Sequence, residues 1–216
     1  MLLLADPQVA AVPVAETAEP LVDLRTSGLR VDDRYADGSG AHAYVRQGVQ
    51  ERLLRAQAAL PGGTNLLVVE GWRSLAMQRA LFSRYAATVR ASEPGLDETA
   101  VRFATSAYIA PPDVAPHATG SAVDLTLCDS DGVELDLGTA LNATPLESEH
   151  RCYTAAEELD PVARRNRGLL VATLARAGLV NYPTEWWHWS YGDRYWALAT
   201  GQPAALFDVA DSPRAG

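Results

Sequence analysis

The order of apolar patterns along this chain of 216 residues restricts it to a mixed fold. Residues 42–60 repeat apolar side chains every three or four positions, as an amphipathic helix does, and residues 65–72 form a short apolar run typical of a buried strand. Later patterns predict helices over 74–91, 97–107 and 160–177, and strands over 121–127 and 185–191. These elements lack the regular strand–helix–strand alternation of a doubly wound sheet. We therefore predict an α+β fold, a single domain with helices packed on a small, mainly antiparallel sheet.

Local end signals are sharpest in the helix predicted over 160–177. Asp160 is a suitable N-cap and Pro161 suits the first helical position. Leu170 and Leu174 belong to its apolar stripe, and Gly178 follows as a stop signal.

A hairpin is expected after the strand 121–127. Asp131-Gly132 is a strong turn signal, and residues 133–137 alternate in polarity beyond it.

The two ends of the chain lack such patterns. Residues 1–20 are rich in Ala, Pro and Val without periodicity, so we expect a flexible or loosely docked tail. It is followed by one domain over 21–210 and a second tail over 211–216. The first residues carry no positive charge, and Asp6 and Pro7 interrupt their apolar run, which disfavours a signal peptide. No apolar run approaches the roughly 20 residues of a spanning helix. We predict a cytoplasmic protein.

Charge excludes two classes of partner. The formal net charge is −9, and all eighteen basic residues are scattered Arg, with no Lys. Nucleic-acid binding requires a clustered basic face, and an electrostatic membrane anchor requires a basic segment. We expect neither partner. Cys128 and Cys152 are too few for a disulfide framework and are expected to be free thiols.

The polar residues that could carry chemistry fall in two segments. His117 and Asp124 lie in HATGSAVD, and Glu185 and His188 lie in EWWH. A catalytic zinc site needs three protein ligands and one open position, so two His and one Asp are a suitable set. Asp124 lies within an apolar run, where a carboxylate needs a metal or an Arg partner. Glu185 and His188 would face opposite sides of a regular strand, so both can approach one metal only across a bend.

Three segments together resemble the zinc D-alanyl-D-alanine dipeptidases: GWR at 71–73, HATGSAVDLTL at 117–127 and EWWH at 185–188. This group also includes cell-wall D,D-carboxypeptidases and the zinc-bearing hedgehog signalling domain. The order and separation of the segments match over residues 21–210.

The resemblance implies one Zn²⁺ per chain, bound by His117, Asp124 and His188. It implies that Glu185 is the general base and that Arg73 stabilises the oxyanion, although Arg73 could instead serve a structural ion pair. The implied reaction is the hydrolysis of a small D-amino-acid peptide, and the first candidate substrate is D-alanyl-D-alanine.

Two positions depart from the dipeptidase pattern. Ala115 stands where these enzymes carry Ser, and Asn142 stands where they carry an acidic residue for the substrate ammonium. Glu147 or Glu149 could replace that charge. The three residues Trp186, Trp187 and Trp189 are expected to form core and pocket wall. Ala115, Asn142 and Trp187 are the candidate substrate-binding residues.

Two other activities therefore stay open beside the dipeptidase. One is a peptidase acting on another dipeptide or on a longer cell-wall peptide. The other is a zinc-bearing binding domain without hydrolysis, which Glu185 disfavours because a structural site needs no base. The remaining histidines, His42 and His150, are expected to be solvated.

Overall fold

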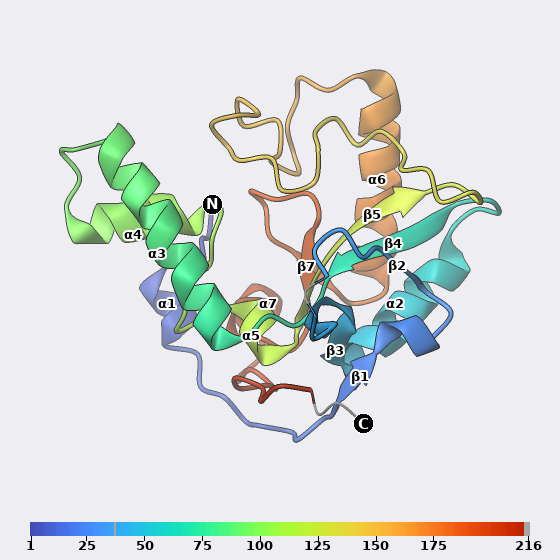
Figure 1. Cartoon of the computed structure of the whole chain (residues 1–216), viewed down its shortest axis with the longest axis horizontal. Helices are drawn as coiled ribbons and strands as arrows, with labels where there is room; N and C mark the ends of the chain where they lie inside the picture. Colours follow the sequence, from blue (N-terminus) through green and yellow to red (C-terminus); the bar gives the residue numbers. More distant parts are fainter. Residues whose placement is uncertain (37, 214–216) are drawn as a thin grey trace.

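A computed structural model describes residues 1–36 and 38–213 and has a five-stranded sheet at its centre (Figure 1). The strand order is β2 (Arg30–Val31), β4 (Asn65–Glu70), β5 (Ala122–Cys128), β7 (His188–Ser190) and β6 (Val180–Asn181). Only the β2–β4 pair is parallel. The predicted α+β fold with a mainly antiparallel sheet is confirmed.

Two long helices pack against the sheet and build the main core. They are α2 (Gln47–Ala59) and α6 (Pro161–Arg176), which lie together beside β4 and β5 in Figure 1. Leu53 of α2 and Leu170 of α6 are buried in one cluster with Leu66 and Leu125 of the sheet. The Asp160 carboxylate accepts a hydrogen bond from an amide of the first turn of α6, as its N-cap position predicts.

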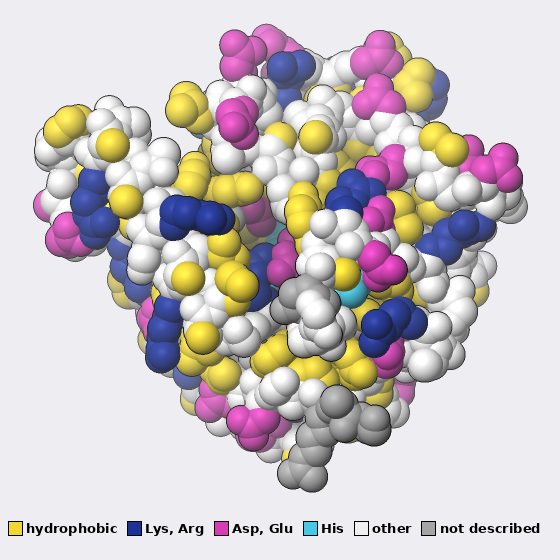
Figure 2. Space-filling model, in the orientation of Figure 1, with side chains coloured by type: hydrophobic (Ala, Val, Ile, Leu, Met, Phe, Trp, Pro, Cys, Tyr) yellow, Lys and Arg dark blue, Asp and Glu magenta, His cyan; other side chains and the backbone are white. Residues whose placement is uncertain are grey.

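A second pair of helices forms a separate lobe on the other side. It consists of α3 (Leu75–Ser92) and α4 (Glu98–Ser106), joined by a small cluster of Ala86, Val89 and Val101. Figure 2 shows the surface hollowed between this lobe and the sheet, with acidic and basic side chains at its bottom.

Short elements connect these parts. They are α1 (Pro7–Ala10), β1 (Leu21–Asp23), η1 (Leu24–Thr26), η2 (Ala41–Ala43), β3 (Tyr44–Arg46), α5 (Pro116–Thr119) and α7 (Arg194–Thr200). Strands β1 and β3 pair in a second, antiparallel sheet. Among the described residues, no helix is both long and apolar enough to cross a membrane.

The N-terminal segment is docked more firmly than the predicted flexible or loosely docked tail. Leu4, Val9 and Val12 are buried, and Leu4 packs in a cluster with Tyr182 and Tyr195. The Leu4 amide donates a hydrogen bond of 3.1 Å to the Tyr182 hydroxyl. The extent of this docking could not be predicted from the sequence, because the apolar residues are few and their partners lie far along the chain. Of the second predicted tail only residues 211–213 are described, and they have no regular secondary structure.

Three other local predictions need correction. The helix predicted from residue 42 begins at Gln47, because residues 41–46 form η2 and β3 instead. His42 is buried rather than solvated, with its Nε2 atom 3.0 Å from Asp33 Oδ1. The predicted hairpin is reduced to a single bridge between Glu134 and Cys128. His150 is exposed and both cysteines are free, as predicted.

Candidate active site

Two neighbouring strands bring two of the predicted metal ligands together. Asp124 on β5 and His188 on β7 are direct partners in the antiparallel register. Side chains of directly opposed residues leave the sheet on the same face, so both point to one side. The Asp124 Oδ1 atom lies 3.0 Å from His188 Nδ1.

A one-turn helix places the third predicted ligand. Pro116 begins α5, and Gly120 ends it with a φ of 75°, which turns the chain directly into β5. His117 on this turn donates from Nδ1 to the Gly71 carbonyl oxygen at 2.6 Å, an assignment fixed by the acceptor. This hydrogen bond leaves the lone pair of Nε2 facing the other two ligands.

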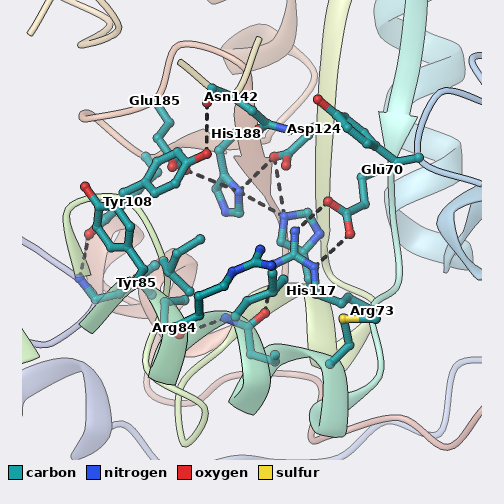
Figure 3. Close-up of a pocket in the computed structure, with 18 of the residues that line it drawn as sticks. Glu70, Arg73, Arg84, Tyr85, Tyr108, His117, Asp124, Asn142, Glu185 and His188 are labelled. Carbon is teal, nitrogen blue, oxygen red and sulfur yellow. Dashed lines mark hydrogen bonds and ion pairs between the residues drawn. The ribbon is translucent and has the colours of Figure 1, made fainter. Parts of the chain in front are cut away.

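The three ligand atoms fit a tetrahedral zinc ion. His117 Nε2 lies 3.2 Å from His188 Nδ1 and 3.4 Å from Asp124 Oδ1 (Figure 3). Two ligands at about 2.0–2.1 Å from zinc, at the tetrahedral angle, are about 3.3 Å apart. All three residues are buried, and no other such group of His, Cys, Asp or Glu occurs in the described part of the chain.

The EWWH segment supplies the bend that the predicted strand required. Residues 185–187 are not extended, because the His188 amide bonds back to the Glu185 carbonyl at 3.2 Å, and β7 begins only at His188. Asn181 holds this turn by donating to the Glu185 and His188 carbonyls, both at 3.0 Å. Glu185 and His188 therefore share one side, with Glu185 Oε2 3.9 Å from His188 Nδ1.

Burial and neighbouring charges shift the pKa values of the two carboxyl groups in opposite directions. Burial raises the pKa of Glu185 well above its usual range, Asp124 raises it further, and Arg73 opposes the shift. Burial acts the same way on Asp124, but His117 and His188 outweigh it and hold the pKa of Asp124 below its usual range. A carboxylate surrounded by two imidazoles is thus kept as an anion, the form that binds a cation.

Arg73 is both an ion-pair partner and a pocket residue. Its Nε and Nη2 atoms donate to the two carboxylate oxygens of Glu70, the first at 2.7 Å, and Nη1 donates to Gln78 Oε1 at 2.9 Å. A guanidinium has five N–H donors, so two remain free for a ligand. Glu70 and Gln78 were missed in the sequence, where only the spacing of Glu70 three residues before Arg73 hinted at a pair.

The candidate metal centre opens into a cavity of about 670 Å³. One face of α3 forms a wall of it, with Met77, Gln78, Leu81, Arg84, Tyr85 and Thr88. Leu141 and Asn142 line the opposite side, where the Tyr108 hydroxyl donates to the Asn142 carbonyl at 2.9 Å. Figure 3 shows His117, Asp124, His188 and Glu185 between these two sides.

Comparison with known proteins assigns the family. The sequence profile of the D-Ala-D-Ala dipeptidase family matches residues 31–208. The chain belongs to the D-Ala-D-Ala dipeptidase family. It is therefore an enzyme of the metallopeptidase class, with the resemblance noted from its motifs confirmed.

Two sequence relatives agree with this assignment, and one solved structure is more distantly similar. A D-alanyl-D-alanine dipeptidase of Synechocystis sp. is 28% identical over 222 residues, which is 89% of this chain and 90% of the relative. One of Enterococcus faecium is 31% identical over 153 residues, 66% of this chain and 70% of the relative. A solved structure of VanYB in complex with D-alanine-D-alanine covers 87% of both chains at 16% identity, with a TM-score of 0.48.

Two of the predicted substrate-binding residues lie elsewhere. Ala115 and Trp187 are buried and do not line the cavity, so of the three candidates only Asn142 does. Trp187 packs edge-on against Trp186 in the main core. Glu147 and Glu149 are exposed and do not line the cavity either.

Proposed function

We propose that this enzyme hydrolyses D-alanyl-D-alanine to two D-alanines with one zinc ion held by His117, Asp124 and His188. The observation that carries the proposal is the spacing of 3.0–3.4 Å among the three ligand atoms, with the Glu185 carboxylate beside them. Zinc in such a site lowers the pKa of a water molecule and polarises the scissile carbonyl.

Glu185 is suited to move the proton. Its Oε2 atom is 3.9 Å from His188 Nδ1, and Glu185 does not belong to the group of three residues that could hold a metal. In the proposed reaction, Glu185 takes a proton from the attacking water and gives it to the amine that leaves.

Arg73 is suited to stabilise the oxygen that gains negative charge. Glu70 and Gln78 hold its guanidinium in place before any substrate arrives, and two N–H groups stay free. Donors fixed in advance cost no reorganisation during the reaction, which makes them effective in the transition state.

A second candidate substrate is a longer peptide that ends in D-Ala-D-Ala. Among the described residues, the only carboxylates lining the cavity are Glu70, which pairs with Arg73, and the proposed ligand and base, Asp124 and Glu185. Asn142 offers an amide but no charge. A free ammonium would therefore lose water without gaining an anion, whereas an acylated nitrogen loses less.

Release of free alanine of either configuration from three substrates tests the proposal. The zinc-loaded protein is incubated with D-Ala-D-Ala, L-Ala-L-Ala and a muramyl pentapeptide. We expect D-Ala from the first substrate and no L-Ala from the L,L peptide. Release from the pentapeptide alone would favour the second candidate, and no release from either D,D substrate would reject both.

Variants distinguish the residues that bind zinc from the residue that transfers the proton. His117→Ala, Asp124→Ala and His188→Ala should each lose tightly bound zinc, whereas the exposed His150→Ala should keep it, as measured by metal analysis. Glu185→Gln should keep zinc and its melting temperature but lose at least about 100-fold in kcat. A Glu185→Gln enzyme with a tenth of the wild-type rate would exclude Glu185 as the base.

A further inference from the structure

The α3 wall of the cavity carries a cation that has no partner. Arg84 shares one helical face with Gln78, Leu81 and Tyr85 and lines the cavity with them. Figure 3 shows its side chain pointing into the pocket, toward the Arg73 guanidinium. The Arg84 guanidinium has neither a hydrogen bond nor an ion pair with any described residue; only the Arg84 backbone carbonyl accepts a bond, from the Thr88 hydroxyl.

Helix geometry explains this direction. Side chains of an α-helix lean toward its N-terminus, so Arg84 leans toward the end of α3 that follows Arg73. The charge of Arg73 is opposed by Glu70, whereas that of Arg84 is opposed by nothing. The α3 wall therefore presents one guanidinium without an ion-pair partner among the described residues, beside the group proposed to stabilise the oxyanion.

We propose that Arg84 binds the terminal carboxylate of the substrate peptide and so selects for a free C-terminus. This assignment rests on the proposed function. In a D,D-dipeptide the carboxylate lies one residue, at most about 3.6 Å of extended chain, beyond the scissile carbonyl. A carboxylate receptor must then stand close to Arg73 on the leaving-group side, and a guanidinium matches a carboxylate with two parallel donors.

The opposite side of the cavity fixes the direction of the peptide. Leu141 and Asn142 carry no charge, and the Tyr108 hydroxyl is already bonded to the Asn142 carbonyl. With a cation on one side and neutral groups on the other, the C-terminus lies toward α3. The N-terminal part of the substrate then lies toward residues 141–142.

A pair of substrates tests the role of Arg84. D-alanyl-D-alaninamide matches D-Ala-D-Ala except that its C-terminus is neutral. We expect Arg84→Ala to lower kcat/KM about 10-fold for the acid, mainly through KM, and to leave the amide within about twofold. Arg79→Ala is the matched control, since Arg79 is an exposed arginine of α3 that does not line the cavity, and should change neither substrate.

An equal loss for acid and amide, or no loss for the acid, overturns the assignment. A binding titration tests the role of Arg84 without requiring that the substrate is hydrolysed. D-Ala-D-Ala is titrated into zinc-loaded Glu185→Gln protein with and without Arg84→Ala. About 10-fold weaker binding in the double variant supports the assignment of Arg84. If the wild type binds in this way but hydrolyses neither substrate, only the proposed function fails. Equal binding to the proteins with and without Arg84→Ala rejects the assignment of Arg84. No measurable binding to either protein also rejects it.

Discussion

Replacement of Gly71 by Ala should weaken zinc binding without touching a ligand. A Cβ atom on Gly71 would lie 2.3 Å from the Tyr44 carbonyl oxygen, 2.9 Å from Val45 Cγ1 and 3.1 Å from the His42 oxygen. The nearest of these atoms belongs to the backbone, and the Gly71 amide is itself bonded to the His42 carbonyl at 2.6 Å. No side-chain rotation can relieve the contact.

The magnitude follows from the same distances. The Gly71 backbone must move by at least about 0.7 Å before the new contact reaches 3.0 Å, in an interior that is already close-packed. Its carbonyl accepts the His117 Nδ1 hydrogen bond at 2.6 Å, and a comparable displacement takes that bond past the upper limit of about 3.2 Å. Loss of a partner that orients a metal-binding His costs about 10- to 100-fold in affinity, or about 1.4–2.7 kcal/mol.

Competition with a chelator of known affinity measures the zinc dissociation constant of Gly71→Ala, and thermal unfolding of the metal-free protein measures its stability. The overpacked residue should also lower the free energy of unfolding by about 1–3 kcal/mol. Gly95→Ala is the control, because nothing lies within 4 Å of a Cβ there. If Gly71→Ala binds zinc within twofold of wild type, the Gly71 carbonyl does not orient His117 as described.

Three further changes probe the surroundings of the site. Asn142→Asp should lower KM for free D-Ala-D-Ala several-fold and leave N-acetyl-D-Ala-D-Ala nearly unchanged, because only the free dipeptide carries an ammonium. Tyr182→Phe removes the hydroxyl that accepts from the Leu4 amide at 3.1 Å and donates to the Ser106 carbonyl at 2.6 Å. It should destabilise the protein by about 1–3 kcal/mol in urea unfolding and speed proteolysis near the N-terminus. Arg167→Met leaves three backbone carbonyls of the loop that carries Asn142 without their donor, which should cost about 3 kcal/mol in urea unfolding and raise KM.

Each of these has a clear contrary result. Equal effects of Asn142→Asp on free and acetylated dipeptide would place the ammonium elsewhere. Unchanged proteolysis in Tyr182→Phe would mean that apolar packing alone holds the N-terminal segment. An Arg167→Met enzyme with wild-type KM would show that substrate binding does not depend on the order of this loop.

Local signals in the sequence were enough for the elements whose ends are set by neighbouring residues. Asp160, Pro161 and Gly178 mark the two ends of α6, and α3 begins directly after Ser74, the first residue of the helix predicted over 74–91. Caps and stops act over a few residues, so they can be recognised without the fold.

Elements that depend on distant partners were predicted less well. The segment 42–46 has a helical apolar pattern, yet it pairs with β1 and packs its carbonyls against Gly71. The segment 133–137 has a strand pattern but keeps one bridge, and its Leu137 is buried in the core. In both cases tertiary contacts outweigh local propensity.

For the site, the residue types and their order can be read directly from the chain: two His, one Asp and one Glu in motifs that identify the family. Their geometry follows only from the folded domain. The turn at 185–187 brings Glu185 beside His188, the register opposes Asp124 and His188, and α3 presents Arg84 to the cavity. The physical reason is that a ligand set is made by backbone segments far apart in the chain, whose approach depends on the packing of the whole domain.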